Sequence, residues 1–125
     1  MANGFAVMRF NEELGDNMGD RPNFAGTAFV GLQSTIQTFD ADNPRGDGYI
    51  LLNVAGMHNE RAQVFLNGVE MPGQNFDPIP VNNDFTTTLV HIHNNIVDGS
   101  NTLQFRNAAG SGDNWVINHV VVHWR

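Results

Sequence analysis

Residues 85–125, FTTTLVHIHNNIVDGSNTLQFRNAAGSGDNWVINHVVVHWR, decide the fold. Three segments rich in β-branched and aromatic residues follow one another here: 85–94, 101–107 and 115–125. The turn at Asp98-Gly99 separates the first two, and the polar loop 110–114 precedes the third. Short apolar runs bounded by turn residues are typical of β-strands. The C-terminal part of the chain therefore predicts three consecutive strands.

The upstream sequence predicts further strands. We expect them at 5–10, 27–39, 49–55 and 61–71. Gly31 marks a bulge or bend in the second of these. The fourth contains a hairpin, because Asn67-Gly68 suits a type I′ turn. The segment 49–55 (YILLNVA) is nearly all apolar, as in a strand that is covered on both faces.

Helical periodicity is almost absent. The best helical segment, 11–14, ends at Gly15 and supports at most a short turn, and the segment 72–84 holds three prolines and cannot be a central strand. Short, regularly spaced strands with turn signals between them indicate an antiparallel sandwich. We therefore predict one all-β domain over residues 1–125, an antiparallel jelly-roll β-sandwich of about eight strands.

The composition limits the classes of partner. The chain has 125 residues, a formal net charge of −7 and no cysteine, which excludes disulfides and thiolate chemistry. It has no basic stripe to neutralise phosphates, so nucleic acid and anionic membrane surfaces are not expected partners. The N-terminus lacks the basic and apolar regions of a Sec signal, which predicts a cytoplasmic protein or a non-classical export route.

The polar surface must be built largely from neutral groups. Charged residues make up only 15% of the chain, and its six cations are all arginines. Asparagine and glycine are abundant instead. Amides donate and accept hydrogen bonds without a charge, which suits neutral polar ligands, although Asn and Gly also serve ordinary turns.

Three segments resemble a known superfamily. Residues 63–70 (QVFLNGVE), 97–105 (VDGSNTLQF) and the closing part, 112–117 with 122–124, are similar to the galactose-binding-domain-like jelly rolls. That superfamily includes many carbohydrate-binding modules and lectin domains, so the resemblance implies a sugar-binding sandwich whose ligands meet loops at one edge. A function inferred from a fold is an analogy.

Two residues of this resemblance have a structural explanation. Gly99 supplies a positive φ at the turn, and Asn101 is placed to hydrogen-bond the local backbone while Leu103 and Phe105 enter the core. We therefore interpret Asn101 as a structural residue and not as a ligand-binding one.

A loop-borne set of residues suits sugar recognition. An aromatic ring can cover the apolar face of a sugar, while carboxylate, amide and guanidinium groups bind its hydroxyls. Asp113, Asn114 and Trp115 place such groups side by side. Further candidates for the same site are Tyr49, His58, Asn59, Arg61, Arg106 and Asn107. The alternative is that Trp115 opens the core of the last strand.

Histidines form the other chemical pattern. His91 and His93 share a strand face, as do His119 and His123, so neighbouring strands would gather imidazoles in a metal-binding geometry. The sequence is similar to the His-x-His of the cupin motif, but Asp98 follows where cupins have glutamate. The alternative is that the histidines line a solvent face.

Calcium is a further candidate, because the resemblance implies a structural calcium in many relatives. The loop residues that could supply oxygen ligands are Asp40, Asp42, Asn43 and Asp47. Their spacing does not match an EF-hand, which needs a glutamate at its twelfth position. We expect no other cofactor.

The leading prediction is a non-enzymatic, lectin-like protein that binds neutral sugars. Since such sites bind weakly, we expect a homo-oligomer that presents several of them. One alternative is a structural or assembly protein, such as a phage or particle component. The other is a metal-dependent jelly-roll enzyme that uses the histidines.

Overall fold

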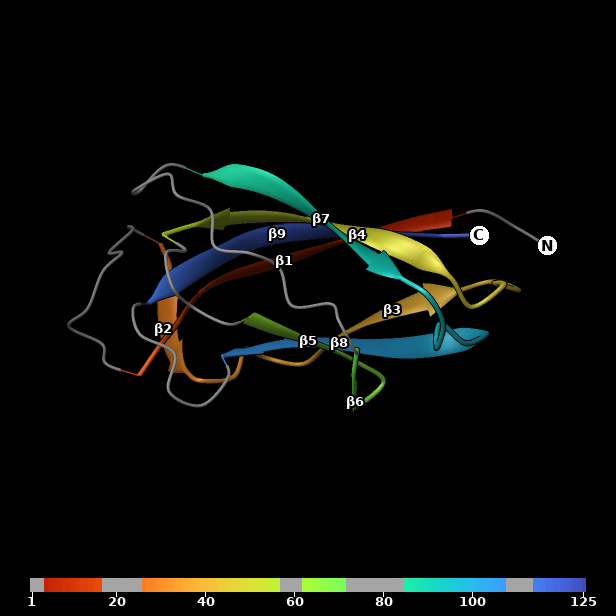
Figure 1. The fold of residues 1–125 in the computed structure, drawn as a ribbon, viewed down its shortest axis with the longest axis horizontal. Helices are drawn as coiled ribbons and strands as arrows, with labels where there is room; N and C mark the ends of the chain where they lie inside the picture. The colour runs from red at the N-terminus through yellow and green to blue at the C-terminus, as the bar shows by residue number, and fades with distance from the viewer. Residues whose placement is uncertain (1–3, 17–25, 57–61, 72–84, 108–113) are drawn as a thin grey trace.

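The protein is a β-sandwich of two sheets (Figure 1). The structure, a computed structural model, describes residues 4–16, 26–56, 62–71, 85–107 and 114–125. The first sheet has the order β2-β1-β9-β4-β7 and the second the order β3-β8-β5-β6. The strands are β1 Gly4–Leu14, β2 Ala28–Gly31, β3 Gln37–Ala41, β4 Gly48–Ala55, β5 Ala62–Leu66, β6 Val69–Glu70, β7 Thr86–Ile92, β8 Gly99–Asn107 and β9 Trp115–Trp124.

The predicted all-β sandwich is confirmed, with nine strands among the described residues. The three C-terminal strands are β7, β8 and β9, but they do not pair with one another in sequence order. The predicted strand at 27–39 is divided into β2 and β3, which belong to different sheets. Gly31, with a φ of 83°, ends β2 at a register shift against β1. The sheet is not purely antiparallel, because β2 runs parallel to β1.

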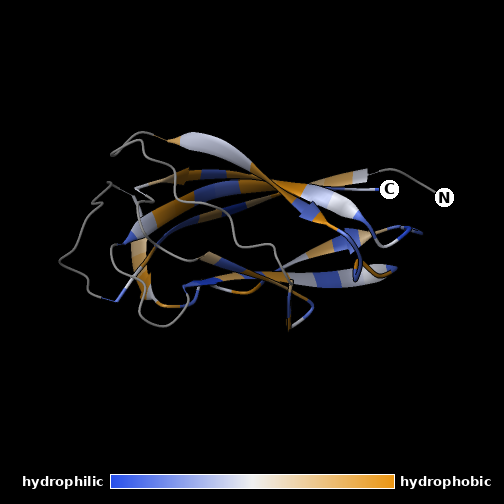
Figure 2. Ribbon diagram, in the orientation of Figure 1, coloured by the Kyte–Doolittle hydropathy of each residue, from blue (hydrophilic) through white to orange (hydrophobic). Residues whose placement is uncertain are grey.

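The core fills the space between the two sheets. Figure 2 shows hydrophobic residues recurring along the strands of both layers. Trp115 and Phe105 are the largest fully buried side chains. Aromatic pairs join the layers: Phe39 of β3 stacks on Trp124 of β9, and Phe10 of β1 meets Phe105 of β8 edge to face. These contacts fix the strands that carry the outer side chains.

The segment 11–14, the best helical candidate in the sequence, belongs to a strand. It continues β1, and Asn11 has a positive φ of 50° where the pairing with β9 shifts register. Glu12 and Glu13, which follow this shift, are both buried. The backbone N–H and the hydroxyl of Thr35 both donate to the Glu12 carboxylate. The side-chain amide of Asn114 donates to the Glu13 carboxylate at 2.7 Å.

The strand β4 is covered on one face only, which corrects the expectation of two covered faces. Ile50, Leu52 and Val54 are fully buried, whereas Tyr49 and Leu51 point away from the core and stay partly exposed. The apolar sequence of β4 therefore leaves hydrophobic side chains on the outer face of the five-stranded sheet. No helix in the described ranges is long and apolar enough to cross a membrane.

The turn chemistry of the second sheet agrees with the prediction. Asn67 and Gly68 both have positive φ, as a type I′ turn requires, and they join β5 to β6. Asn101 is fully buried, and its side chain binds backbone groups of Val97 and Gly99. The structural interpretation of Asn101 is confirmed.

A glycine is required where β4 meets β9. A Cβ at Gly48 would overlap the backbone carbonyl of His123, a group that cannot move without breaking the strand pairing. We expect Gly48→Ala to lower the free energy of unfolding by about 1–3 kcal/mol, the usual cost of overpacking. Urea denaturation measures the loss, and an unchanged midpoint would show that the two strands adjust without cost. Gly48 does not have a positive φ, so the loss reports the overlap with the neighbouring backbone.

Candidate functional site

Side chains on the outer face of the five-stranded sheet form rows that run across its strands. One row, here called the aromatic row, consists of Phe5 on β1, His123 on β9, Tyr49 on β4 and His91 on β7. Strand register places each member directly opposite the next: Phe5 opposite His123, His123 opposite Tyr49, and Tyr49 opposite His91. Directly opposed side chains on one sheet face are close enough to interact.

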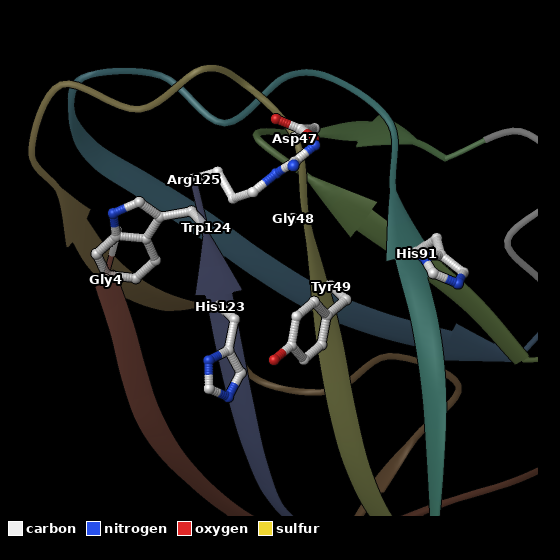
Figure 3. Close-up of a pocket in the computed structure, with 8 residues that line it drawn as sticks. All are labelled: Gly4, Asp47, Gly48, Tyr49, His91, His123, Trp124 and Arg125. Atoms are coloured by element: carbon white, nitrogen blue, oxygen red, sulfur yellow. The ribbon is translucent and has the colours of Figure 1, made fainter. Parts of the chain in front are cut away.

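Three rings of the aromatic row, those of Phe5, His123 and Tyr49, lie against one another. The centroids of the Tyr49 and His123 rings are 4.6 Å apart and their planes differ by 16°. Phe5 extends the row on the other side of His123, with centroids 5.9 Å apart. Figure 3 shows Tyr49 and His123 projecting to the same side from adjacent strands, with His91 beyond Tyr49. The stack holds the Tyr49 ring in place and leaves 36% of that residue exposed.

A cavity of about 490 Å³ lies at this end of the sheet. Its lining comes from four neighbouring strands and the residues beside them: Gly4, Asp47, Gly48, Tyr49, His91, His123, Trp124 and Arg125 (Figure 3). Tyr49, His91 and His123 all line it, and the Tyr49 ring stacks on the His123 ring. The cavity therefore offers an aromatic wall, two imidazoles and a charged pair. We call it the Tyr49 groove.

The charged pair lies at one end of the Tyr49 groove. Nη2 of Arg125 binds Oδ2 of Asp47 at 2.6 Å. This hydrogen bond from Arg125 holds the pKa of the Asp47 carboxyl below its usual value, and the charges of Arg125 and Arg45 act in the same direction. Asp47 therefore stays ionised as the pH falls into the usual range of carboxyl groups. Because Asp47 contacts one of the five N–H donors of a guanidinium, Arg125 keeps further donors for a ligand.

A second row, here called the aliphatic row, runs beside the aromatic one. It consists of Val7, Val121, Leu51 and Leu89, opposed in that order across β1, β9, β4 and β7. Val7 is 63% exposed and Leu89 46%. A contiguous strip of exposed apolar side chains is typical of an interaction surface.

The outer face of the four-stranded sheet is polar and internally bonded by contrast. Arg106 lies over the Phe65 ring, 3.8 Å from its centroid, and donates to Gln104. Gln63 donates to Glu70 on the adjacent strand. These contacts occupy the polar groups of that face with one another, so the two faces of the sandwich differ in chemistry.

Three of the predicted sugar-binding residues, Trp115, Asn114 and Asn107, are buried. Trp115 and Asn114 are fully buried, and Asn107 is nearly so. Nε1 of Trp115 donates to Oδ1 of Asn107, and Asn114 binds Glu13. These side chains stabilise the core where β9 begins, so the Trp115 ring offers no face to a sugar. The alternative, that Trp115 opens the core of the last strand, is confirmed.

The remaining predicted sugar-binding residues are scattered or lie outside the described part of the chain. Arg106 is on the four-stranded sheet, away from the Tyr49 groove. Asp113, His58, Asn59 and Arg61 lie outside the described residues. Of the predicted set, Tyr49 lines the cavity described above, together with other polar groups.

The histidines share faces as predicted, but their strands are not neighbours. His91 and His93 have ring centroids 6.3 Å apart, while β4 separates them from His119 and His123 on β9. Among the described residues, no three His, Asp, Glu or Cys side chains gather as metal ligands. This holds for the predicted calcium ligands Asp40, Asp42 and Asp47 as well, and Asp47 is bound by Arg125. The histidines line an exposed face, opposite the buried Val90 and Ile92.

The sequence did not predict that Asp47, His91, His123 and Arg125 line one cavity with Tyr49. Asp47 and His91 appeared only as possible metal ligands, and Arg125 not at all. The sequence does indicate which residues face outward. Tyr49 and Leu51 in one strand, like Leu89 and His91 in another, alternate with apolar residues that are buried. The order β9-β4-β7, which brings them together, does not follow from local pattern.

Comparison with known proteins identifies a family and several similar folds. Residues 2–125 match a family described as "Family of unknown function (DUF7383)". Among curated proteins, none matches the chain. The CBM36-1 domain of a multidomain xylanase, from the hindgut metagenome of Trinervitermes trinervoides, superposes with a TM-score of 0.58 at 11% identity, over 95% of this chain and 96% of that domain.

Two larger enzymes contain a similar region. The cycloalternan-forming enzyme from Listeria monocytogenes, in complex with a pentasaccharide substrate, gives a TM-score of 0.58 at 18% identity. The match covers 82% of this chain and only 10% of that enzyme. The Podospora anserina GH26-CBM35 β-(1,4)-mannanase gives 0.55 at 12% identity, over 98% of this chain and 28% of the mannanase. At these identities the likeness shows the fold alone.

Proposed function

The chain belongs to the DUF7383 family, and we propose that it is a non-catalytic carbohydrate-binding protein that holds a sugar against Tyr49 in the Tyr49 groove. The observation that carries the proposal is the position of the Tyr49 ring, stacked on His123 at 4.6 Å and forming a wall of the cavity. A sugar offers an apolar C–H face and a rim of hydroxyls, and it needs both kinds of partner in one place.

The groove supplies the polar partners beside the ring. The hydroxyls of a sugar on Tyr49 would meet the imidazole of His91 and the free donors of Arg125, with Asp47 as an acceptor. Charge-assisted hydrogen bonds from such groups are stronger than those between neutral partners. Because Asp47 balances Arg125, the pair recognises hydroxyl groups without requiring a charged sugar.

The fold supports the same class of function. The CBM36-1 domain, a carbohydrate-binding module of a xylanase, matches the chain over nearly the full length of both. The two larger proteins with a similar region include one bound to a pentasaccharide and one with a CBM35 module. A fold can serve many functions, so the groove and not the likeness carries the assignment.

The chemistry of the groove favours binding over hydrolysis. Most glycoside hydrolases use two carboxyl groups on opposite sides of the scissile bond. Among the residues that line the Tyr49 groove, Asp47 is the one carboxylate, and Arg125 lowers its pKa. A general acid for this reaction needs a raised pKa instead. We therefore propose recognition without catalysis.

Substitution of Tyr49 tests the proposal. We expect a glycan array to identify one or more neutral oligosaccharides that bind the protein. Tyr49→Ala should weaken their binding roughly tenfold or more, because the wall that covers the sugar face is lost. Isothermal titration calorimetry measures the change. Tyr49 lies on the surface, so its thermal unfolding should change little.

Phe65→Ala provides the matched control. Phe65 is also a partly exposed aromatic residue on an outer face, but it belongs to the four-stranded sheet and lies under Arg106. We expect its glycan affinity to equal that of the wild type. Equal glycan affinity in Tyr49→Ala and the wild type would place the sugar site elsewhere. A glycan array without hits would favour the alternative of a structural or assembly protein.

A further inference from the structure

The edge strands of the two sheets differ in how they are protected. The five-stranded sheet ends in β2 and β7, and the four-stranded sheet in β3 and β6. Natural proteins protect edges with short strands, charges, prolines or bulges, because unpaired N–H and C=O groups attract another strand. β2 has four residues, β6 has two and carries Glu70, and β3 carries the exposed Asp40. Three of the four edges are thus protected.

The strand β7 has none of these features. Its seven residues, TTTLVHI, include no Asp, Glu, Lys, Arg or Pro. It pairs with β4 over seven consecutive residues without a register shift, so no bulge turns its edge away. Among the described strands, β4 is its one neighbour. The composition is rich in β-branched residues, which favours extension of the sheet.

The aliphatic row reaches the edge of the sheet at Leu89. This side chain lies opposite Leu51 and is 46% exposed. Leu89 is also close to the middle of β7, three residues after its first residue and three before its last. An antiparallel pair of β7 strands related by a two-fold axis at Leu89 therefore aligns the full length of both strands.

We propose that a second copy of this chain pairs with the β7 edge, antiparallel and two-fold symmetric about Leu89, so that two five-stranded sheets form one continuous sheet. The interface is isologous, as a two-fold dimer requires. Leu89 meets Leu89 of the partner subunit, which makes the two aliphatic rows continuous. His91, at the border of the Tyr49 groove, lies opposite Thr87 of the partner subunit.

The pairing places both Tyr49 grooves on one face of the joined sheet. Strand spacing and rise put the two tyrosines about 20 Å apart. If the groove binds sugar as proposed above, one branched or repeating glycan can engage both sites, which raises the overall affinity. The dimer itself stands independently of that function, because backbone pairing and the aliphatic row carry it.

Cysteine cross-linking tests the register of the pair. The chain has no cysteine, so one introduced thiol forms a disulfide only between copies. Directly opposed residues have Cβ atoms about 4.5–5.5 Å apart, near the range that a disulfide spans. We expect Leu89→Cys to form a covalent dimer on mild oxidation. Thr87→Cys, on the same face of the same strand, should not, because the two-fold axis separates its copies by about four residues of strand.

A charge at the same position tests the interface without a covalent bond. Leu89→Lys sets two like charges directly opposite each other, and we expect the dimer dissociation constant in analytical ultracentrifugation to rise roughly tenfold or more. Val69→Lys makes a matched change on the exposed edge strand β6 and should leave the mass distribution unchanged. A wild-type protein that stays monomeric at all concentrations would overturn the proposal. So would a dimer that survives Leu89→Lys and resists cross-linking through Leu89→Cys.

Discussion

Replacing Trp115 with alanine is expected to lower the free energy of unfolding by about 3–5 kcal/mol, the usual cost of removing a large buried aromatic side chain. Trp115 is fully buried where β9 begins, and its indole N–H binds the side chain of Asn107. The substitution leaves a cavity. It also removes the indole N–H that donates to the buried amide oxygen of Asn107. For a domain of this size, such a loss is a large part of the total stability.

Chemical denaturation measures the effect, and a milder variant separates its two causes. Trp115→Phe keeps most of the ring volume but removes the N–H, so it should cost about 1–3 kcal/mol, the price of one unsatisfied buried acceptor. If Trp115→Ala instead unfolds at the wild-type denaturant concentration, Trp115 does not support the core. A loss of glycan binding with full stability would restore Trp115 as a ligand-binding residue.

Asn101→Ala is expected to cost about 2–4 kcal/mol, since it removes several hydrogen bonds that no neighbour can replace. The Asn101 side chain accepts from the N–H of Val97 at 2.8 Å and from Asn67 at 3.0 Å. It donates to the carbonyls of Val97 and Gly99 at 2.9 and 3.1 Å. Asn101 therefore joins the turn before β8 to the hairpin between β5 and β6.

The control for Asn101 is its neighbour in the same strand. Ser100 is exposed and points to the other side of β8, so Ser100→Ala should change the stability by about 0.5 kcal/mol or less. Thermal unfolding followed by circular dichroism compares the two variants. Equal midpoints would mean that water replaces the hydrogen bonds of Asn101 and that this side chain is not a structural bridge.

The features of the fold that depend on neighbouring residues were predictable from the sequence. The Asn67-Gly68 turn, the Gly99-Asn101 strand entry and the position of β9 each follow from short-range rules. These rules act over a few consecutive residues, so the local sequence is enough to apply them. The structural interpretation of Asn101 was possible for the same reason.

The features that depend on strand order were not predictable. The loop before Trp115 and the tyrosine at the start of β4 carry equally suitable residue types, and only the structure shows that one is buried and the other exposed. Trp115 and Trp124, at the two ends of β9, are separated by about 30 Å of strand, so the predicted site and the Tyr49 groove lie at opposite ends of that strand. The bulge at Asn11 and the burial of Glu12 and Glu13 likewise have no clear mark in the sequence.

The position of the sugar site is tested most directly by a backbone amide chemical-shift titration of the wild-type protein with a glycan that the array identifies. We expect the largest shifts to cluster at the Tyr49 groove, at residues 47–49, 91 and 123–125. Shifts concentrated at residues 106, 107 and 114 would contradict it and place the ligand at the loop before Trp115. Shifts spread over both faces without a cluster would contradict it as well.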